Sequence, residues 1–248
     1  MSYEIWTKIK RHAGEEDPIM VEITPGVHQI DGVSANSYLI LEGDGSLTLV
    51  DTGTSAGGKK ILDYMKNTLS KQPSDLKTIV ITHAHIDHIR GALSLKKATG
   101  AKVAIHEQDA EFLARRKKLS TPRGGTGVLF RFFSIFFRAL AMEPDIRLKE
   151  GDQIGASLKV VTTPGHTPGS LSLYDNQRKL VFVGDSIITR GGKLQGPPKQ
   201  FTEDWSQAMS SIEKISSLDF VILLSGHGDP VKSGGTQKVR EFSASIKK

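Results

Sequence analysis

The residues of this chain that could carry out metal chemistry are concentrated in the segment 82–88. It reads Thr-His-Ala-His-Ile-Asp-His, so three of the eight histidines fall within six residues. His83 and His85 are two positions apart and point to the same side of an extended backbone, whereas Asp87 and His88 are adjacent and point elsewhere. Imidazole and carboxylate groups suit zinc, iron, manganese or nickel. The segment therefore predicts two ligands for each of two neighbouring metal positions.

Three more candidate ligands follow other predicted strands. His166 lies in a Thr-Pro-Gly-His-Thr-Pro-Gly turn, Asp185 in a Gly-Asp pair, and His227 in Ser-Gly-His-Gly. With the four donors of 82–88 they make seven, more than the about four that one tetrahedral ion accepts. The sequence therefore predicts a site for more than one ion.

The chain alternates short apolar strands with helices, an order typical of an α/β protein. Strands are expected at 19–23, 27–30, 37–41, 46–50, 77–82, 101–105, 145–148, 158–162, 170–174, 179–183 and 220–224. Helices are expected at 58–70, 87–98, 107–118, 203–216 and from 235 onward. Thr202 is expected to cap the fourth helix, and the Gly and Pro pairs at 191–192 and 197–198 predict a long loop.

An internal repeat relates the two halves of the chain. In the first half, a hairpin ends in Asp51, and a helix and a strand then lead to His83. In the second half, a hairpin ends in Asp185, and a helix and a strand lead to His227. Two such units packed face to face would bring both histidine turns to one edge.

The composition excludes several kinds of site. The 248 residues include no cysteine, which rules out disulfides, thiolate metal sites and cysteine nucleophiles. The N-terminus has no apolar signal region, and no apolar run reaches the roughly 18 residues of a membrane span. We therefore expect a cytoplasmic protein without stable membrane insertion. The net charge of +6 indicates a lysine-rich solvated surface, with an anionic substrate or nucleic acid as the alternatives.

Two segments fall outside the regular pattern. Residues 1–18 are polar and predict an N-terminal leader, while 19–248 form the main domain. Within that domain 119–143 reads as an insertion, and its part 128–142 is apolar, with five of the ten phenylalanines. Such a segment indicates an interaction surface. We expect it to border the active site as an apolar wall for the substrate, with a homodimer through the same segment as a further expectation. A core helix and a membrane-surface anchor are the alternatives.

In residue types, spacing and order, the region 19–230 resembles the metallo-beta-lactamase superfamily. Four elements carry the resemblance: His-x-His-x-Asp-His, Pro-Gly-His-Thr-Pro-Gly, the Gly-Asp after a strand, and the late Gly-His-Gly. The resemblance implies a four-layer αββα sandwich with two divalent metal ions between the sheet edges. Zinc is favoured, with iron or manganese as alternatives.

The resemblance also divides the seven candidate ligands between the two ions. The ligands of the first ion would be His83, His85 and His166. Those of the second would be Asp87, His88 and His227, and Asp185 would bridge both. A pair of ions lowers the pKa of bound water to roughly 7, so a bridging hydroxide would be the nucleophile. Asp87 and Asp185 are thus the catalytic candidates, with Asp87 also able to accept a proton.

Five other residues have weaker signals. Asp51 matches a family position that orients a metal-bound histidine, and a turn-forming aspartate is the equal alternative. His106 is expected to be a surface or helix-capping residue, and His12 and His28 to be ordinary. Asp229 is expected to act in a turn.

Several branches of the superfamily fit the chain less well. The lack of cysteine, together with Asp185, argues against a classical zinc beta-lactamase, and His85 argues against a flavodiiron protein. The 41 residues between Asp185 and His227 leave no room for a nuclease cap domain. The chain stops 21 residues after His227, so the C-terminal domain of glyoxalase II is expected to be missing. Lactonases of acyl-homoserine lactones share all seven ligands.

The sequence thus predicts a binuclear hydrolase that cleaves an ester, thioester or lactone bond of a small molecule. Two alternatives remain open. The first is a ribonuclease Z-like phosphodiesterase acting on RNA, motivated by the basic pI of about 9.4, although the four-residue cluster 115–118 is too short for an RNA-gripping arm. The second is a mononuclear iron oxidoreductase similar to persulfide dioxygenases.

Overall fold

The computed structural model of the chain describes residues 20–31, 35–114, 116–117 and 141–246. The predicted leader 1–18 lies outside these residues, as does the apolar segment 128–142 except for Ala141 and Met142. The predicted roles of both segments therefore stay predictions. Within the described ranges, no helix combines the length and the hydropathy needed to cross a membrane.

The first sheet contains seven strands that follow one another in chain order. They are β1 (Met20–Thr24), β2 (Val27–Asp31), β3 (Asn36–Leu41), β4 (Leu47–Val50), β5 (Leu76–Ile81), β6 (Lys102–His106) and β7 (Ile146–Leu148). Strands β1 to β4 pair antiparallel, and β4 to β7 pair in parallel.

The second sheet contains five strands in the order β14-β11-β10-β9-β8. They are β8 (Gln153–Ile154), β9 (Leu158–Thr162), β10 (Leu171–Asp175), β11 (Leu180–Gly184) and β14 (Ile222–Ser225). A separate hairpin consists of β12 (Ile188–Arg190) and β13 (Lys193–Gln195). The helices are α2 (Ser55–Asn67), α3 (Ile86–Ile89), α4 (Ala92–Thr99), α5 (Glu107–Leu113), α7 (Trp205–Ser216) and α8 (Gly235–Ile246), with 3-10 turns η1 (Pro73–Asp75) and η2 (Lys199–Phe201).

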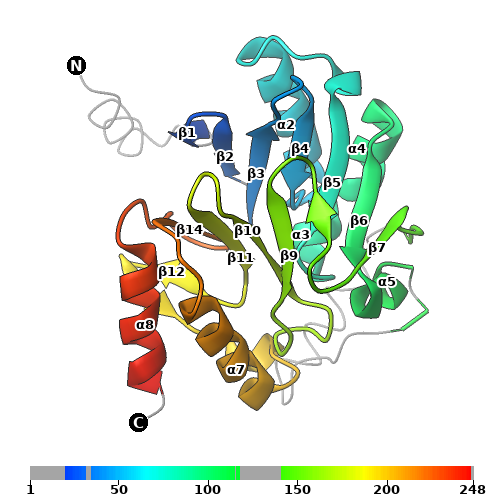
Figure 1. Cartoon of the computed structure of the whole chain (residues 1–248). Helices are drawn as coiled ribbons and strands as arrows, with labels where there is room; N and C mark the ends of the chain where they lie inside the picture. The colour runs from blue at the N-terminus through cyan, green and yellow to red at the C-terminus, as the bar shows by residue number, and fades with distance from the viewer. Residues whose placement is uncertain (1–19, 32–34, 115, 118–140, 247–248) are drawn as a thin grey trace, which may run out of the picture.

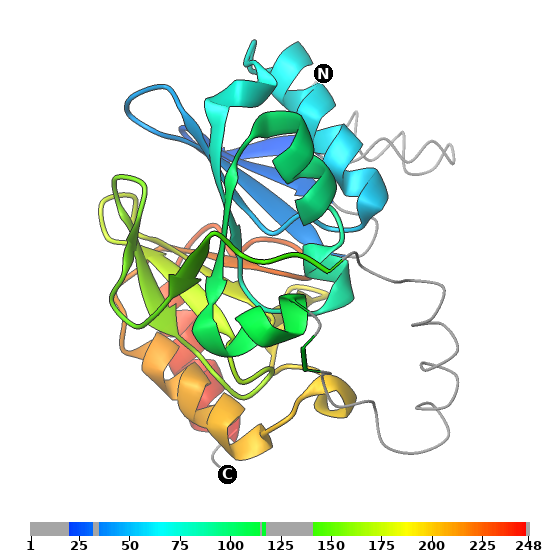
Figure 2. The ribbon, with the colours of Figure 1, turned by 90° about the vertical axis from the view of Figure 1, so that its right-hand side faces the viewer.

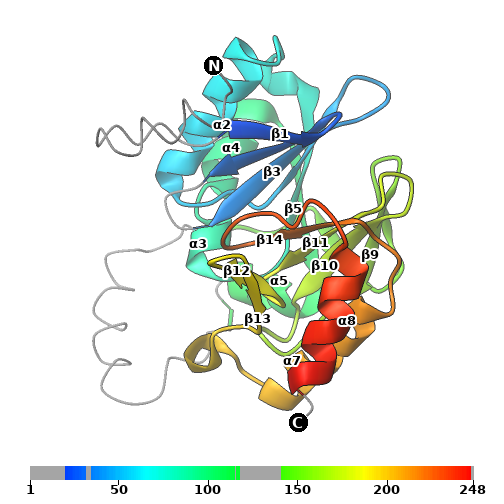
Figure 3. The same cartoon turned by 90° about the vertical axis from the view of Figure 1, so that its left-hand side faces the viewer.

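The sheets and helices stack in four layers, which confirms the predicted αββα sandwich (Figure 1). Figures 2 and 3 show α2 and α4 on the outer face of the first sheet, and α7 and α8 on the outer face of the second. Strand side chains alternate between the resulting apolar layers. In β5, Ile79 packs towards the helices and Val80 between the sheets; in β11, Phe182 packs between the sheets and Val181 towards α7 and α8. Because both faces are covered, the strands read as continuous apolar runs.

The predicted internal repeat is present in the topology. The hairpin β3–β4 continues through α2 into β5, which is parallel to β4. The hairpin β10–β11 continues through α7 into β14, which is parallel to β11. Parallel neighbours end at the same sheet edge, so residues that follow β4, β5, β11 and β14 are brought together.

Some predicted helix boundaries were wrong. The first helix begins at Ser55 rather than at residue 58, and the third ends at Leu113 rather than at 118. The predicted helix 87–98 is two helices, α3 and α4. They are separated because the Gly91 N–H donates to Thr52 Oγ1 (3.1 Å) instead of extending α3, and a Cβ on Gly91 would lie 2.8 Å from the Thr52 carbonyl oxygen.

Two predictions in the second half were also wrong. The expected long loop contains the hairpin β12–β13, which turns at the glycine pair 191–192. The cap of α7 is Asp204, which accepts a hydrogen bond from the Gln207 N–H (2.9 Å), and not Thr202. Thr202 Oγ1 instead donates to the Pro198 carbonyl (2.9 Å).

Candidate metal centre

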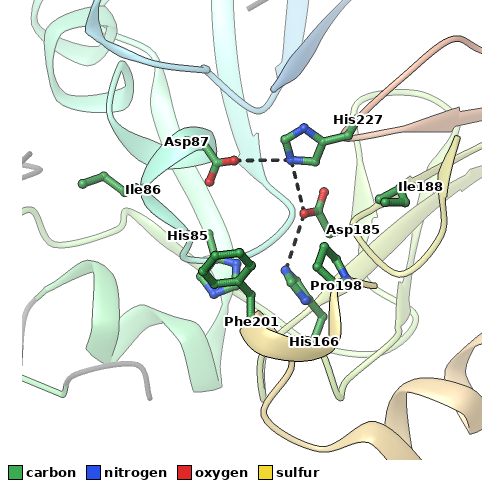
Figure 4. A pocket seen from close by; sticks show the side chains of 9 residues that line it. All are labelled: His85, Ile86, Asp87, His166, Asp185, Ile188, Pro198, Phe201 and His227. Atoms are coloured by element: carbon green, nitrogen blue, oxygen red, sulfur yellow. Dashed lines mark ion pairs between the residues drawn. The ribbon is translucent and has the colours of Figure 1, made fainter. Parts of the chain in front are cut away.

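All seven predicted ligands gather where the two sheets meet, at the carboxyl ends of four strands. His83 follows β5, and the N-terminal turn of α3 then supplies three more donors. His166 lies in the turn between β9 and β10, Asp185 directly follows β11, and His227 follows β14. Figure 4 shows five of the donors around one cavity: His85, Asp87, His166, Asp185 and His227.

The donors form three groups, in each of which the possible ligand atoms lie within 4.8 Å of one another. The groups are His83, His85 and His166; Asp87, His88 and His227; and His83, His88 and Asp185. The first two groups share no member, and the third connects them. Each of the three groups could therefore hold a metal ion.

Asp185 lies between the two histidine groups. Its Oδ2 is 3.5 Å from His166 Nε2 and 3.3 Å from His227 Nε2, and its Oδ1 is 3.4 Å from His88 Nε2. Asp87 is on the other side of His227, with Oδ2 3.3 Å from the same Nε2. The Asp185 carboxylate can therefore face a cation in either group.

Several of these donor atoms are buried without a hydrogen-bond partner among the described residues. They are Nε2 of His83, His88 and His166, and Oδ1 of Asp185. An unsatisfied buried polar atom costs about 1–3 kcal/mol, so a fold retains four such atoms in one place only for a ligand. Divalent cations fit this set of neutral nitrogen and anionic oxygen donors.

The other ring nitrogen of the same histidines is held by a neighbour. His83 Nδ1 lies 3.1 Å from Thr82 Oγ1, and His166 Nδ1 lies 3.4 Å from Thr202 Oγ1. These contacts orient the rings so that Nε2 points into the site.

Asp51 orients a third histidine, which is one of the two roles that the sequence left open. Its Oδ2 is 2.8 Å from His88 Nδ1, and its two oxygens accept hydrogen bonds from the backbone N–H and the hydroxyl of Thr82 (2.8 and 2.7 Å). Asp51 has φ = 57°, a conformation that costs energy for a residue other than glycine. The fold therefore maintains a strained residue in order to place this carboxylate against His88. His106 was correctly predicted as a capping residue, since its Nδ1 accepts from the Gln108 N–H (3.3 Å).

One histidine group is held in the neutral form. Burial lowers the pKa of His83 well below its usual value, that of His85 to about 4, and that of His166 to about 3. Neutral imidazole is the form that binds metal, so these three rings need not lose a proton to do so.

The other group attracts positive charge. Burial opposes a charge on His227, but hydrogen bonds from its ring to Asp185 and Asp87 raise its pKa to about 9. Burial likewise opposes a charge on Asp87, but the neighbouring His88 and His227 lower its pKa to about 2. Both aspartates are therefore ionised at neutral pH, and a cation bound beside them would be stabilised.

The cavity beside these donors has a volume of about 410 Å³. Five of the residues that line it are the donors shown in Figure 4, and the other four are Ile86, Ile188, Pro198 and Phe201. A small molecule in this cavity would contact the donors on one side and apolar side chains on the other.

A family model described as "Metallo-beta-lactamase superfamily" matches residues 30–227. The chain belongs to this superfamily. It is 28% identical over 229 residues to the probable metallo-hydrolase YflN of Bacillus subtilis (strain 168), covering 85% of this chain and 86% of that protein. It is 24% identical over 229 residues to the hydroxyacylglutathione hydrolase GloC of Haemophilus influenzae, and the match covers 90% of this chain and 97% of that protein. The crystal structure of metallo-beta-lactamase family protein TTHA1429 from Thermus thermophilus has the same fold, with a TM-score of 0.69 and 23% identity over 91% of this chain and 81% of that one.

Membership of the metallo-beta-lactamase superfamily implies a hydrolase that uses divalent metal ions. The donor set described above is consistent with that implication, since it includes three groups of residues able to hold a metal ion.

Asp109 is a residue of this metallo-beta-lactamase fold whose importance sequence reasoning missed. It is fully buried in α5, where Oδ2 accepts hydrogen bonds from the Ala84 N–H (2.8 Å) and the Thr167 hydroxyl (2.7 Å). Its Oδ1 accepts from the Gly169 N–H (2.7 Å). One carboxylate thus joins the loop of His83 and His85 to the turn of His166. The sequence does contain one indication of this role. Asp109 stands four positions before Leu113, so both lie on the same, buried face of the helix.

A substitution at Gly226 tests how closely the candidate site is packed. A Cβ at this position would lie 2.3 Å from Asp185 Oδ1 and 2.7 Å from His88 Cε1. Gly226→Ala should therefore displace both donors and reduce metal binding about 10-fold or more, a loss of ~1.4 kcal/mol. Gly43→Ala is the matched control, since a Cβ on Gly43 would meet nothing within 4 Å. Equal metal affinity in the two variants would contradict the packing.

Proposed function

We propose that this chain is a binuclear metal-dependent hydrolase that cleaves an ester, thioester or lactone bond of a small molecule. The observation that carries the proposal is the placement of Asp185 between two separate donor groups, with contacts of 3.3–3.5 Å to histidines of both. A site for one ion would not need the second group.

We assign one ion to each histidine group, and zinc is favoured over iron or manganese. His83, His85 and His166 would hold the first ion. Asp87, His88 and His227 would hold the second, with Asp185 bridging both. The mixture of imidazole and carboxylate donors without thiolate suits each of these metals.

Bound divalent cations lower the pKa of a water molecule to roughly 7 and polarise a substrate carbonyl oxygen. The chain positions the remaining groups. Asp87 is about a third exposed to the cavity, with a side-chain exposure of 30%, and His227 fixes its Oδ2 at 3.3 Å. Asp87 is thus a partly exposed carboxylate that can accept a proton beside the substrate.

The substrate class is supported by the shape of the cavity and by one relative. The cavity of about 410 Å³ accommodates a small molecule rather than a polymer strand. The relative GloC is named for hydrolysis of hydroxyacylglutathione, which is a thioester. Ester, thioester and lactone hydrolysis share attack on an acyl carbon, so one site can serve all three bonds.

The first prediction from this proposal concerns metal content. The purified protein should bind about two divalent ions per chain, because seven donors exceed the about four that one tetrahedral ion accepts. Elemental analysis after supplementation with zinc, iron or manganese measures this number. A content that never exceeds one ion per chain would contradict the binuclear proposal.

The function itself is tested with a panel of substrates on the metal-loaded protein. Turnover of lactones, thioesters or carboxylic esters, lost on chelation and restored by metal, would support the proposal. A phosphodiester such as bis-p-nitrophenyl phosphate should react much more slowly. Preferential cleavage of the phosphodiester would favour the ribonuclease Z-like alternative, and oxygen consumption with a persulfide by an iron-loaded protein would favour the dioxygenase-like one.

A further inference from the structure

The apolar part of the cavity lining, which we call the wall, is built from three separate elements. Ile86 is the first residue of α3, Ile188 is the first of β12, Pro198 directly precedes η2, and Phe201 is the last residue of η2. In Figure 4, Ile86 lies on the side of Asp87 and Ile188 on the side of Asp185. Apart from the candidate metal ligands, no polar or charged side chain of the described residues lines this cavity.

The wall is connected to the metal centre through the backbone next to η2. The Thr202 hydroxyl donates to the Pro198 carbonyl (2.9 Å) and lies 3.4 Å from His166 Nδ1. The Glu203 N–H donates to the His166 carbonyl (3.2 Å). Phe201 is therefore held at a set position relative to His166.

Phe201 is unusual in being large, apolar and exposed. Its side chain is 36% exposed, and among the described residues only Trp205 and Val221 are comparable, with 38% and 48%. Of these three, Phe201 alone lines the cavity. An apolar group at the mouth of a binding cavity is stabilised when a ligand covers it, by about 25 cal/mol for each Å² removed from water.

We propose that this wall is a subsite for an uncharged, apolar acyl or alkyl group attached to the bond that is cleaved. A carboxylate or phosphate placed against it would lose hydration without meeting a cationic side chain of the described residues, which is unfavourable. The subsite therefore selects apolar acyl compounds over glutathione conjugates and nucleotides. The inference rests on the proposed function for the position of the scissile bond, but the subsite can be tested by binding alone.

The binding test uses two metal chelators that differ in their apolar tail. Octanohydroxamate should bind the zinc-loaded wild type about 10-fold more tightly than acetohydroxamate, because its chain covers the wall. Phe201→Ala should remove most of this difference while leaving the affinity for acetohydroxamate and the metal content unchanged. Val221→Ala is the matched control, since Val221 is exposed but lies at the end of β14 away from His227. Val221→Ala should keep the full difference in affinity between the two hydroxamates.

The kinetic test compares p-nitrophenyl octanoate, acetate and hemisuccinate. Wild type should prefer the octanoate, and Phe201→Ala should lower kcat/KM about 10-fold for the octanoate and little for the acetate, mainly through KM. Ile188→Lys should shift the preference towards the anionic hemisuccinate.

The outcomes separate the two proposals. The subsite would be overturned if wild type bound both hydroxamates equally, whatever bond the enzyme hydrolyses. An equal loss of affinity for both hydroxamates in Phe201→Ala would overturn it as well. A normal preference for octanohydroxamate without turnover of any ester, thioester or lactone would overturn the proposed function and leave the subsite standing.

Discussion

Asp185→Asn is expected to lower kcat by ~100-fold or more, since even groups that only orient a metal ligand contribute 10–100-fold. Asp185 is within 3.5 Å of histidines from both donor groups. Its negative charge would offset part of the charge of the two proposed cations. An amide has nearly the same shape but no charge, so it can neither bridge nor neutralise them. Steady-state kinetics at saturating metal, with elemental analysis of the same samples, measure the effect.

The fold should survive this substitution, because Asp185 Oδ1 has no hydrogen-bond partner among the described residues. The thermal unfolding midpoint of the metal-free variant should accordingly be close to that of the metal-free wild type. Asp229→Asn serves as the control, since Asp229 is exposed and only two residues from His227. Near wild-type turnover in Asp185→Asn would show that Asp185 is not the bridge.

Asp109→Ala is expected to have the second largest effect, a loss of about 3 kcal/mol or more in the free energy of unfolding. The substitution removes the acceptor of three buried donors, and each donor left unsatisfied costs about 1–3 kcal/mol. Those donors are the Ala84 and Gly169 N–H groups and the Thr167 hydroxyl. Among the described residues the two N–H groups have no other acceptor, whereas the Thr167 hydroxyl also lies 2.8 Å from Ser170 Oγ. Because all three donors belong to the two loops that present His83, His85 and His166, affinity for the first metal ion should fall as well. Denaturant unfolding and metal titration measure the two effects.

The pH dependence of the stability lost in Asp109→Ala should show that the Asp109 carboxyl group is responsible for the loss. Burial raises the pKa of Asp109 to about 6, against hydrogen bonds from Thr167, Ala84 and Gly169 that lower it. The folded protein then binds this proton more tightly than the unfolded chain, so its contribution to stability falls as pH rises from about 4 to about 6. The difference in stability between wild type and Asp109→Ala should narrow over that range. Asp152→Asn is the control, because exposed Asp152 also accepts a backbone N–H (2.8 Å, from Lys149) but far from the site. A difference that does not change with pH would contradict the raised pKa.

The layered fold could be predicted because its causes are local in the sequence. Strands covered on both faces are apolar where they are buried, as in all of β11 and in the last three residues of β5, and this produces short continuous runs that are easy to locate. Helix ends were less predictable. The separation of α3 from α4 depends on the contact between Gly91 and Thr52, which are 39 positions apart. No local propensity encodes such a contact.

The candidate donors were evident from the sequence because metal binding restricts residue type. Histidine and aspartate at the ends of four predicted strands indicated that these side chains meet at one sheet edge. For Asp51 the sequence left two roles equally open, a turn-forming aspartate and a partner of a ligand histidine, and the contact with His88 Nδ1 at 2.8 Å favours the second. Topology explains this success, since Asp51 and Asp185 end equivalent strands of an internal repeat.

By itself, then, the sequence predicted an α/β protein from the periodicity of its strands and helices, and through a family resemblance it also predicted the αββα sandwich and the superfamily. It named the seven candidate donors as well, because ligand chemistry restricts residue type and spacing. Only the tertiary structure decided which other side chains meet those donors. Asp109 contacts loops 25 and 60 residues away, and Thr202 reaches His166 across 36. Nothing in the sequence distinguishes Phe201 from the other phenylalanines, and only the fold places it in the lining of the cavity. Such roles depend on long-range packing, which brings together residues whose types alone do not distinguish them.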